Sequence, residues 1–157
     1  MEVQASKSAG LKTLLLLHKA LLIGQLIFAA VAFYLIYTDS FPKEWQHLDQ
    51  VLQVAAIVFS TTGFFAGSML FKKRLLKARK TETGLADKWA LYRTACIIQW
   101  AMIEAPCLFA ITCFLLTGNY AFFALAAVLI LLFTTMGPSS VKIIFQLQVS
   151  EAEIAEL

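Results

Sequence analysis

Apolar residues fill four long stretches of this chain, and charged residues are almost confined to the segments between them. The stretches run from Ala20 to Thr38, from Gln50 to Phe71, from Thr94 to Gly118 and from Asn119 to Val141, with Pro138 ending the useful part of the last. About 20 helical residues are needed to cross a hydrocarbon core of about 30 Å. The pattern therefore predicts four membrane-spanning helices.

The composition excludes a soluble domain. Hydrophobic residues make up 60% of the 157 residues and charged residues only 15%, with a mean hydropathy of +0.76, whereas about a quarter of the residues of a soluble domain are charged. We predict an all-α fold, a four-helix transmembrane bundle of two hairpins that forms a single integral membrane domain over residues 1–157. The predicted spans are about 12–38, 48–72, 88–118 and 119–137, followed by a tail at 138–157.

Basic residues collect in the connection between the second and third spans. This segment holds Lys72, Lys73, Arg74, Lys77, Arg79, Lys80, Lys88 and Arg93 against only Glu82 and Asp87. Short cytoplasmic connections carry an excess of Lys and Arg, so we place this one and both termini in the cytoplasm. We expect a multi-pass protein of the bacterial cytoplasmic (inner) membrane, whose basic connection touches anionic lipid and does not bind nucleic acid.

Glu104 is the only charged side chain inside the four stretches, and it lies near the middle of the third. A carboxylate is costly to hold ionised at that depth, so it is usually protonated, paired or functional. One hypothesis is a structural hydrogen bond to Gln25 or Ser60. A second is proton or cation handling, in which Gln25 or Thr61 stabilises one state. A third is contact with a ligand or another subunit.

Small and polar residues recur at helical spacing and indicate which faces pack together. In the second span the line contains Ala56, Ser60, Gly63 and Gly67, and in the first it contains His18, Gln25, Ala29 and Ala32. A weaker line in the fourth contains Tyr120, Ala124, Ala127, Leu131 and Thr134. We expect each line to face another helix.

In the third span the small line passes through Gln99, Met102 and Pro106, whereas Glu104 shares the roughly opposite line with Trp100. If the small line faces the bundle, Glu104 faces outward. Pro106 keeps the alternative open, because a proline kink can rotate the carboxyl inward.

The sequence Ala-Met-Ile-Glu-Ala around Glu104, within a short chain of two hairpins, resembles the proteolipid (c or K) subunits of rotary ATPases. The resemblance implies that Glu104 carries a proton. This chain departs from that family in having only seven glycines and in placing the acid on the first helix of its second hairpin. The block from the third span through TGN to MGPSSVKIIFQLQVSEAEIAEL is similar to uncharacterised small four-span bacterial membrane proteins, which implies no activity.

Groups that could support catalysis or bind a cofactor are sparse. Cys96, Cys107 and Cys113 form no CxxC pair, and the predicted topology puts His18 and His47 on opposite sides of the membrane. The sequence contains no glycine-rich phosphate loop and no GxSxG motif. We therefore expect no enzymatic activity, no metal and no cofactor.

The tail after Pro138 contains two helix-start signals. Ser139 or Ser140 can cap the segment that follows, and Ser150 with Glu153 fits a capping box. The second signal predicts a short amphipathic C-terminal helix. We favour a helix that lies beneath the bundle over one that docks a partner.

These patterns favour a small non-enzymatic subunit or accessory factor of a larger membrane assembly. Its expected partners are the lipid bilayer and either other membrane subunits or further copies of the chain. The alternative is a proton-coupled transporter, or a proteolipid-like oligomer that moves protons through Glu104.

Overall fold

The computed structural model describes residues 9–42, 45–80 and 84–149, and this part of the chain is helical without any strand. Its elements are α2 (Ala9–Tyr37), the short 3-10 helix η1 (Gln46–Leu48), α3 (Asp49–Lys80), α4 (Leu85–Thr117), α5 (Tyr120–Thr135) and α6 (Ser140–Leu147). The predicted all-α class is therefore confirmed. The proposed capping box at Ser150 and Glu153 lies outside the described residues.

Three of these helices, α2, α3 and α4, are long and apolar enough to cross a membrane. At about 1.5 Å per residue they are roughly 44–50 Å long, which exceeds a hydrocarbon core of about 30 Å. Helix α3 runs eight residues past the predicted boundary at 72 and ends at Lys80. Its last turns contain Lys, Arg, Leu and Ala, which favour helix even in water.

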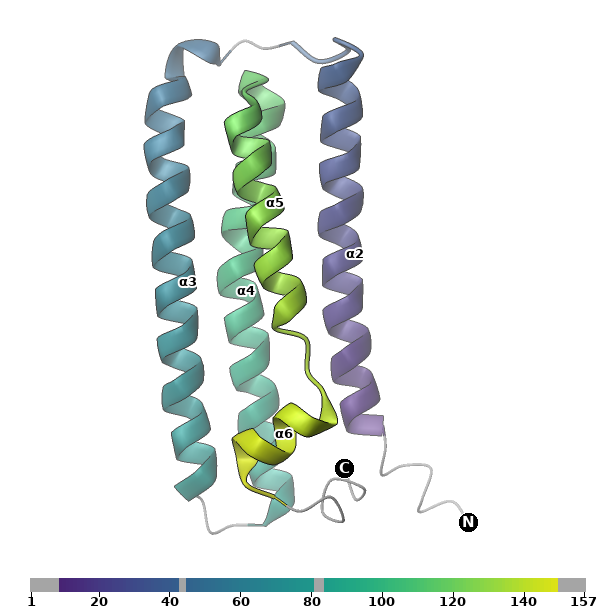
Figure 1. The fold of residues 1–157 in the computed structure, drawn as a ribbon, viewed down its shortest axis with the longest axis vertical. Coiled ribbons are helices and arrows are strands. Elements are labelled where there is room, and N and C mark those ends of the chain that lie inside the picture. Colours follow the sequence, from purple (N-terminus) through teal and green to yellow (C-terminus); the bar gives the residue numbers. More distant parts are fainter. Residues whose placement is uncertain (1–8, 43–44, 81–83, 150–157) are drawn as a thin grey trace.

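Helix α5 is shorter than we predicted for the fourth span. Its 16 residues extend over about 24 Å, and the helix ends at Thr135, three residues before Pro138. The chain then turns into α6, whose first turn is capped by the Ser139 hydroxyl, which accepts a hydrogen bond from the Lys142 backbone N–H at 3.3 Å. Figure 1 shows α6 lying across the end of the bundle where α2 begins and α3 ends.

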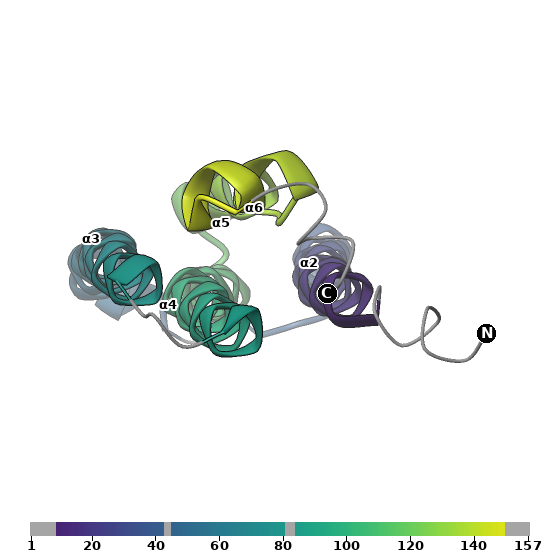
Figure 2. The same ribbon diagram turned by 90° about the horizontal axis from the view of Figure 1, so that it is seen from below.

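Helix α4 occupies the centre of the molecule. It packs against α3, α5 and α2, whereas α2 and α3 lie on opposite flanks of it (Figure 2). Helix α2 therefore packs against α4 and α5 and makes little contact with α3, the next long helix in the chain. Side-chain contacts explain this arrangement. The small-residue line of α3 packs against α4, and the His18 side chain of α2 contacts Trp100, which is also on α4.

The largest side chains in the core are aromatic residues of α4 and α5. Trp100, Tyr92, Phe114, Phe122 and Phe133 are almost completely buried. The face of α5 that packs is therefore the one carrying Phe122 and Phe133. The weaker small-residue line predicted for this helix is exposed, so that prediction was wrong; the exposed residues are Tyr120, Ala124, Ala127, Leu131 and Thr134.

The two small-residue lines of the long helices are buried. Ala29 and Ala32 lie in the core on α2, and Ala56, Ser60, Gly63 and Gly67 are buried on α3. A Cβ atom added at Gly67 would lie 3.1 Å from Cβ of Met102 on α4. Small residues thus let the backbones of α3 and α4 approach closely.

Candidate functional site

Glu104 is half-buried on α4. Among the described residues, its carboxyl makes no hydrogen bond and no ion pair. Its helical neighbours Ala101 and Ala105 are exposed. The side chain therefore lies at the edge of the bundle, beside an open face of α4.

The contacts of α4 show which way Glu104 points. Met102 and Pro106 face α3, because Gly63 of that helix lies against the Met102 carbonyl oxygen and the Pro106 ring. Glu104 is two residues from each of them, or about 200° around the helix. It consequently points away from α3, toward the side where Trp100 meets α2.

The predicted polar partners of Glu104 are not bonded to it. Gln25 is only 1% exposed, and within residues 9–42, 45–80 and 84–149 neither its amide oxygen nor its amide nitrogen has a hydrogen-bond partner. The Ser60 hydroxyl, on a residue 6% exposed, is likewise unpaired. The hypothesis of a hydrogen bond from Glu104 to Gln25 or Ser60 is therefore wrong for this structure.

Geometry explains why these residues do not form one cluster. Gln25 belongs to α2, whereas Ser60 and Thr61 belong to α3, and α4 separates the two helices (Figure 2). Thr61 is exposed. Helical spacing in the sequence indicates on which side of its helix each residue lies. It does not indicate which neighbouring helix that side contacts.

Trp100 is fully buried and belongs to a different polar arrangement. Its indole Nε1–H donates to the Met136 carbonyl at 3.2 Å, and His18 Nε2–H donates to the Phe133 carbonyl at 3.0 Å. The imidazole of His18 stacks on the Phe133 ring at 4.7 Å and meets the Trp100 indole edge-on at 4.9 Å. Side chains of α2 and α4 thus bond to backbone carbonyls at the C-terminal end of α5, where the Phe133 carbonyl also accepts from the Met136 N–H at 3.0 Å.

Lys142 of α6 completes this arrangement. Its ammonium group donates to the carbonyls of Thr135 at 2.7 Å and Gly137 at 3.1 Å. A cation at the C-terminal end of a helix also interacts favourably with the helix dipole. Sequence reasoning missed this role, although Lys142 is the only basic residue that follows the fourth apolar stretch.

A cavity of about 170 Å³ lies beside Lys142, where α3, α4 and α6 meet the turn after α5. Most of its lining residues carry polar groups, including Tyr92, Cys96, Gln99, Thr135, Lys142 and Gln146. Gln99 had been assigned only to a packing line, so its place in a polar cavity was not predicted. Segments from three regions of the sequence build this site, and no local motif marks it.

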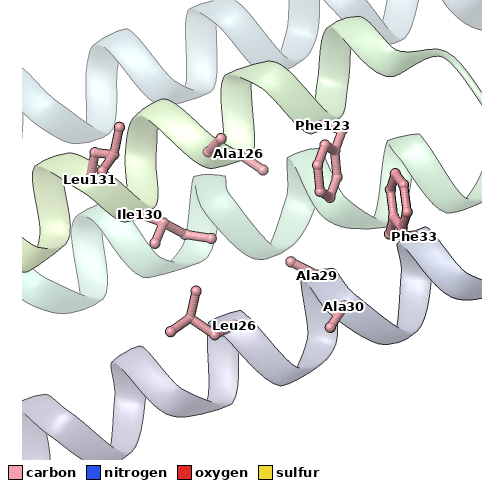
Figure 3. Close-up of a pocket in the computed structure, with 9 residues that line it drawn as sticks. Leu26, Ala29, Ala30, Phe33, Phe123, Ala126, Ile130 and Leu131 are labelled. Carbon is pink, nitrogen blue, oxygen red and sulfur yellow. The ribbon is translucent and has the colours of Figure 1, made fainter.

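A larger groove of about 590 Å³ opens between α2 and α5 (Figure 3). Leu26, Ala29 and Phe33 form one wall, and Phe123, Ala126 and Ile130 form much of the other. None of the side chains that line it can form a hydrogen bond. The groove can therefore accept only an apolar occupant.

The three thiols, Cys96, Cys107 and Cys113, are free and buried. Within the described ranges, no group of three His, Cys, Asp or Glu side chains is placed to hold a metal ion. Candidate chemistry in this part of the chain therefore rests on Glu104 and on the polar cavity beside α6.

Comparison with known proteins gives no relative for this chain. No protein-family model, no curated protein and no solved structure matches it. The resemblances to proteolipid subunits and to small four-span bacterial membrane proteins accordingly stay predictions.

Proposed function

We propose that this chain is a four-span protein of the bacterial cytoplasmic membrane and serves as a non-enzymatic subunit or accessory factor of a larger membrane assembly. Helix α5 is the fourth span, and both termini lie in the cytoplasm. The three long apolar helices support the membrane assignment. The high apolar content of α5, which contains no charged residue, supports the fourth span.

The distribution of surface residues supports the orientation. The end of the bundle at which α3 finishes and α4 begins, the basic end, carries the clustered Lys and Arg residues. The opposite end exposes aromatic side chains that suit a membrane interface, namely Tyr34, Tyr37, Trp45 and Tyr120. Because cytoplasmic connections carry an excess of positive charge, this distribution supports a cytoplasmic position for the basic end.

The accessory role rests on one observation, the unpaired carboxyl of Glu104 at the edge of α4. An acid at this depth is costly unless a neighbour hydrogen-bonds or pairs with it. The described part of this chain supplies no such neighbour. The exposed Ala101 and Ala105 beside it would let a second helix approach closely enough to supply the missing donor.

Purification in a mild detergent, followed by native mass measurement and identification of bound proteins, tests this role. We expect other membrane subunits to copurify with the wild type and to be lost from Glu104→Ala. Thr61→Val is the matched control, because Thr61 is exposed on a different helix, and it should retain the partners.

The proton-translocating alternative predicts a different result. It would give a homo-oligomer without other subunits, and vesicles containing the wild type would show a proton flux that Glu104→Gln abolishes. That outcome would overturn the accessory role. If Glu104→Ala retained the partners, the result would instead show that Glu104 does not contribute to the contact with them.

A further inference from the structure

The cavity beside α6 offers hydrogen-bond donors for which the described residues supply no acceptor. The Lys142 ammonium group has three N–H donors, and two of them are directed to carbonyls. The side chain of Gln146 accepts from the Tyr92 hydroxyl at 2.9 Å through its Oε1, and its NH₂ group donates to no acceptor among the described residues. Gln99 makes no side-chain hydrogen bond within the described part of the chain.

The charged side chain among the described residues that line the cavity is a cation. None of the described residues that line it carries a carboxylate, whereas Lys142 contributes a fixed positive charge. Arg79 lies just outside, where its Nε–H donates to the Gln146 carbonyl at 2.6 Å and its Nη2–H to the Phe145 carbonyl at 3.3 Å. A cation beside further free N–H groups, here those of Gln99 and Gln146, suits the binding of an oxyanion such as phosphate.

The outer face of α6 indicates a source for a phosphate group that could bind in this cavity. Ile143 and Leu147 bury the inner face of this helix, whereas Val141 and Phe145 are 63% and 75% exposed. An amphipathic helix that exposes bulky apolar side chains beside a basic surface is typical of a helix lying in the membrane interface. With the membrane placement proposed above, the cavity would lie at the level of the lipid head groups.

We propose that this cavity binds the phosphate head group of an anionic phospholipid from the cytoplasmic leaflet, with Lys142 as its cation and Gln99 and Gln146 as its donors. The proposal depends on the membrane placement given under Proposed function. It does not depend on the accessory role, because Glu104 does not line this cavity.

Binding of a fluorescent phosphatidylglycerol to the detergent-purified full chain tests the proposal, with phosphatidylcholine as the comparison lipid. We expect phosphatidylglycerol to bind more tightly. Lys142→Gln should weaken its binding about tenfold, as expected for one charge-assisted hydrogen bond, and Lys142→Arg should restore much of it. Lys73→Gln removes an exposed charge from the same end of the molecule and should change binding by less than about twofold.

Lys142 also bonds to carbonyls of the turn after α5, so its replacement could weaken lipid binding by disturbing the fold. A second variant separates these two effects. Gln99→Leu leaves that turn intact and should still weaken phosphatidylglycerol binding. Equal binding of the two lipids, or wild-type binding by both Lys142→Gln and Gln99→Leu, would overturn the proposal. Displacement of the lipid by inorganic phosphate would overturn the lipid source, because the ligand would then be the free anion.

Discussion

At the scale of single residues, Gly63 of α3 lies so close to the Met102 carbonyl of α4 that a side chain at this position would overlap the carbonyl oxygen. Pro106 lacks the N–H that would normally bond to this carbonyl, so the oxygen has no helical donor. The backbone of Gly63 lies directly against it, with the Pro106 ring also in contact. Such an approach allows a weak Cα–H···O contact, and it requires a residue without a Cβ atom.

Gly63→Ala should therefore destabilise the protein by about 1–3 kcal/mol, because the new methyl group would overlap a backbone oxygen that cannot move aside. Thermal unfolding in detergent measures the effect. Gly24→Ala is the control, since nothing lies within 4 Å of a Cβ atom at that position. Equal stability of the two variants would show that α3 shifts away from α4 at little cost.

Gln25 and Gln53 form a second matched pair. Both lie on long helices, but the Gln25 amide is unpaired, whereas Gln53 Nε2–H donates to the Asp49 carboxylate at 3.1 Å. Gln25→Leu should stabilise the protein by about 1–3 kcal/mol by removing an unsatisfied buried group. Gln53→Leu should destabilise it, and denaturant titration compares the two. Loss of stability in Gln25→Leu would mean that a bound water or ligand satisfies the amide.

At the scale of elements, the tight turn between α4 and α5 locks three helices together. Gly118 adopts the left-handed conformation that ends α4, with φ of 72°. Asn119 then caps α5, because its Oδ1 accepts from the Ala121 N–H at 2.9 Å. The Asn119 Nδ2–H donates to the carboxylate of Asp49, the first residue of α3. One amide thus serves both as a helix cap and as a tether.

Asn119→Ser separates these two functions. Serine keeps a capping oxygen but cannot supply the amide donor to Asp49, so we expect a loss of about 1–3 kcal/mol from the bond to a charged group. Asp49→Asn should produce a smaller loss. Amide hydrogen exchange at the start of α3 checks the tether, and unchanged protection in Asn119→Ser would contradict it.

The sequence predicted the positions of the helices better than it predicted which side of each helix packs against the others. Helix positions and the Gly63 line followed from apolar length and small-residue spacing. The packing face of α5 did not, because a helix that is apolar all round gives no periodic signal. Its bulky Phe122 and Phe133 pack inward, whereas its small Ala124 and Ala127 are exposed.

At the scale of the whole molecule, the central position of α4 could not be predicted from its sequence. Its small line meets α3, while Trp100 on another face meets His18 of α2. Glu104 could be identified as exceptional from its charge alone. That no described residue pairs with Glu104 depends on which helices surround α4, and helical spacing does not contain that information.

Because α4 lies at the centre, the order in which the helices are synthesised differs from the order in which they can pack together. Helix α2 leaves the ribosome first, yet the surfaces that receive it, around Trp100 and Phe133, belong to α4 and α5. If the helices span a membrane as we propose, α2 would stay in the lipid, with the polar groups of His18 and Gln25 not yet covered by α4 and α5, until the second half of the chain has been inserted. Helices that insert independently and associate later permit such a delay. The N-terminal helix is thus the last of the long helices able to reach its final place.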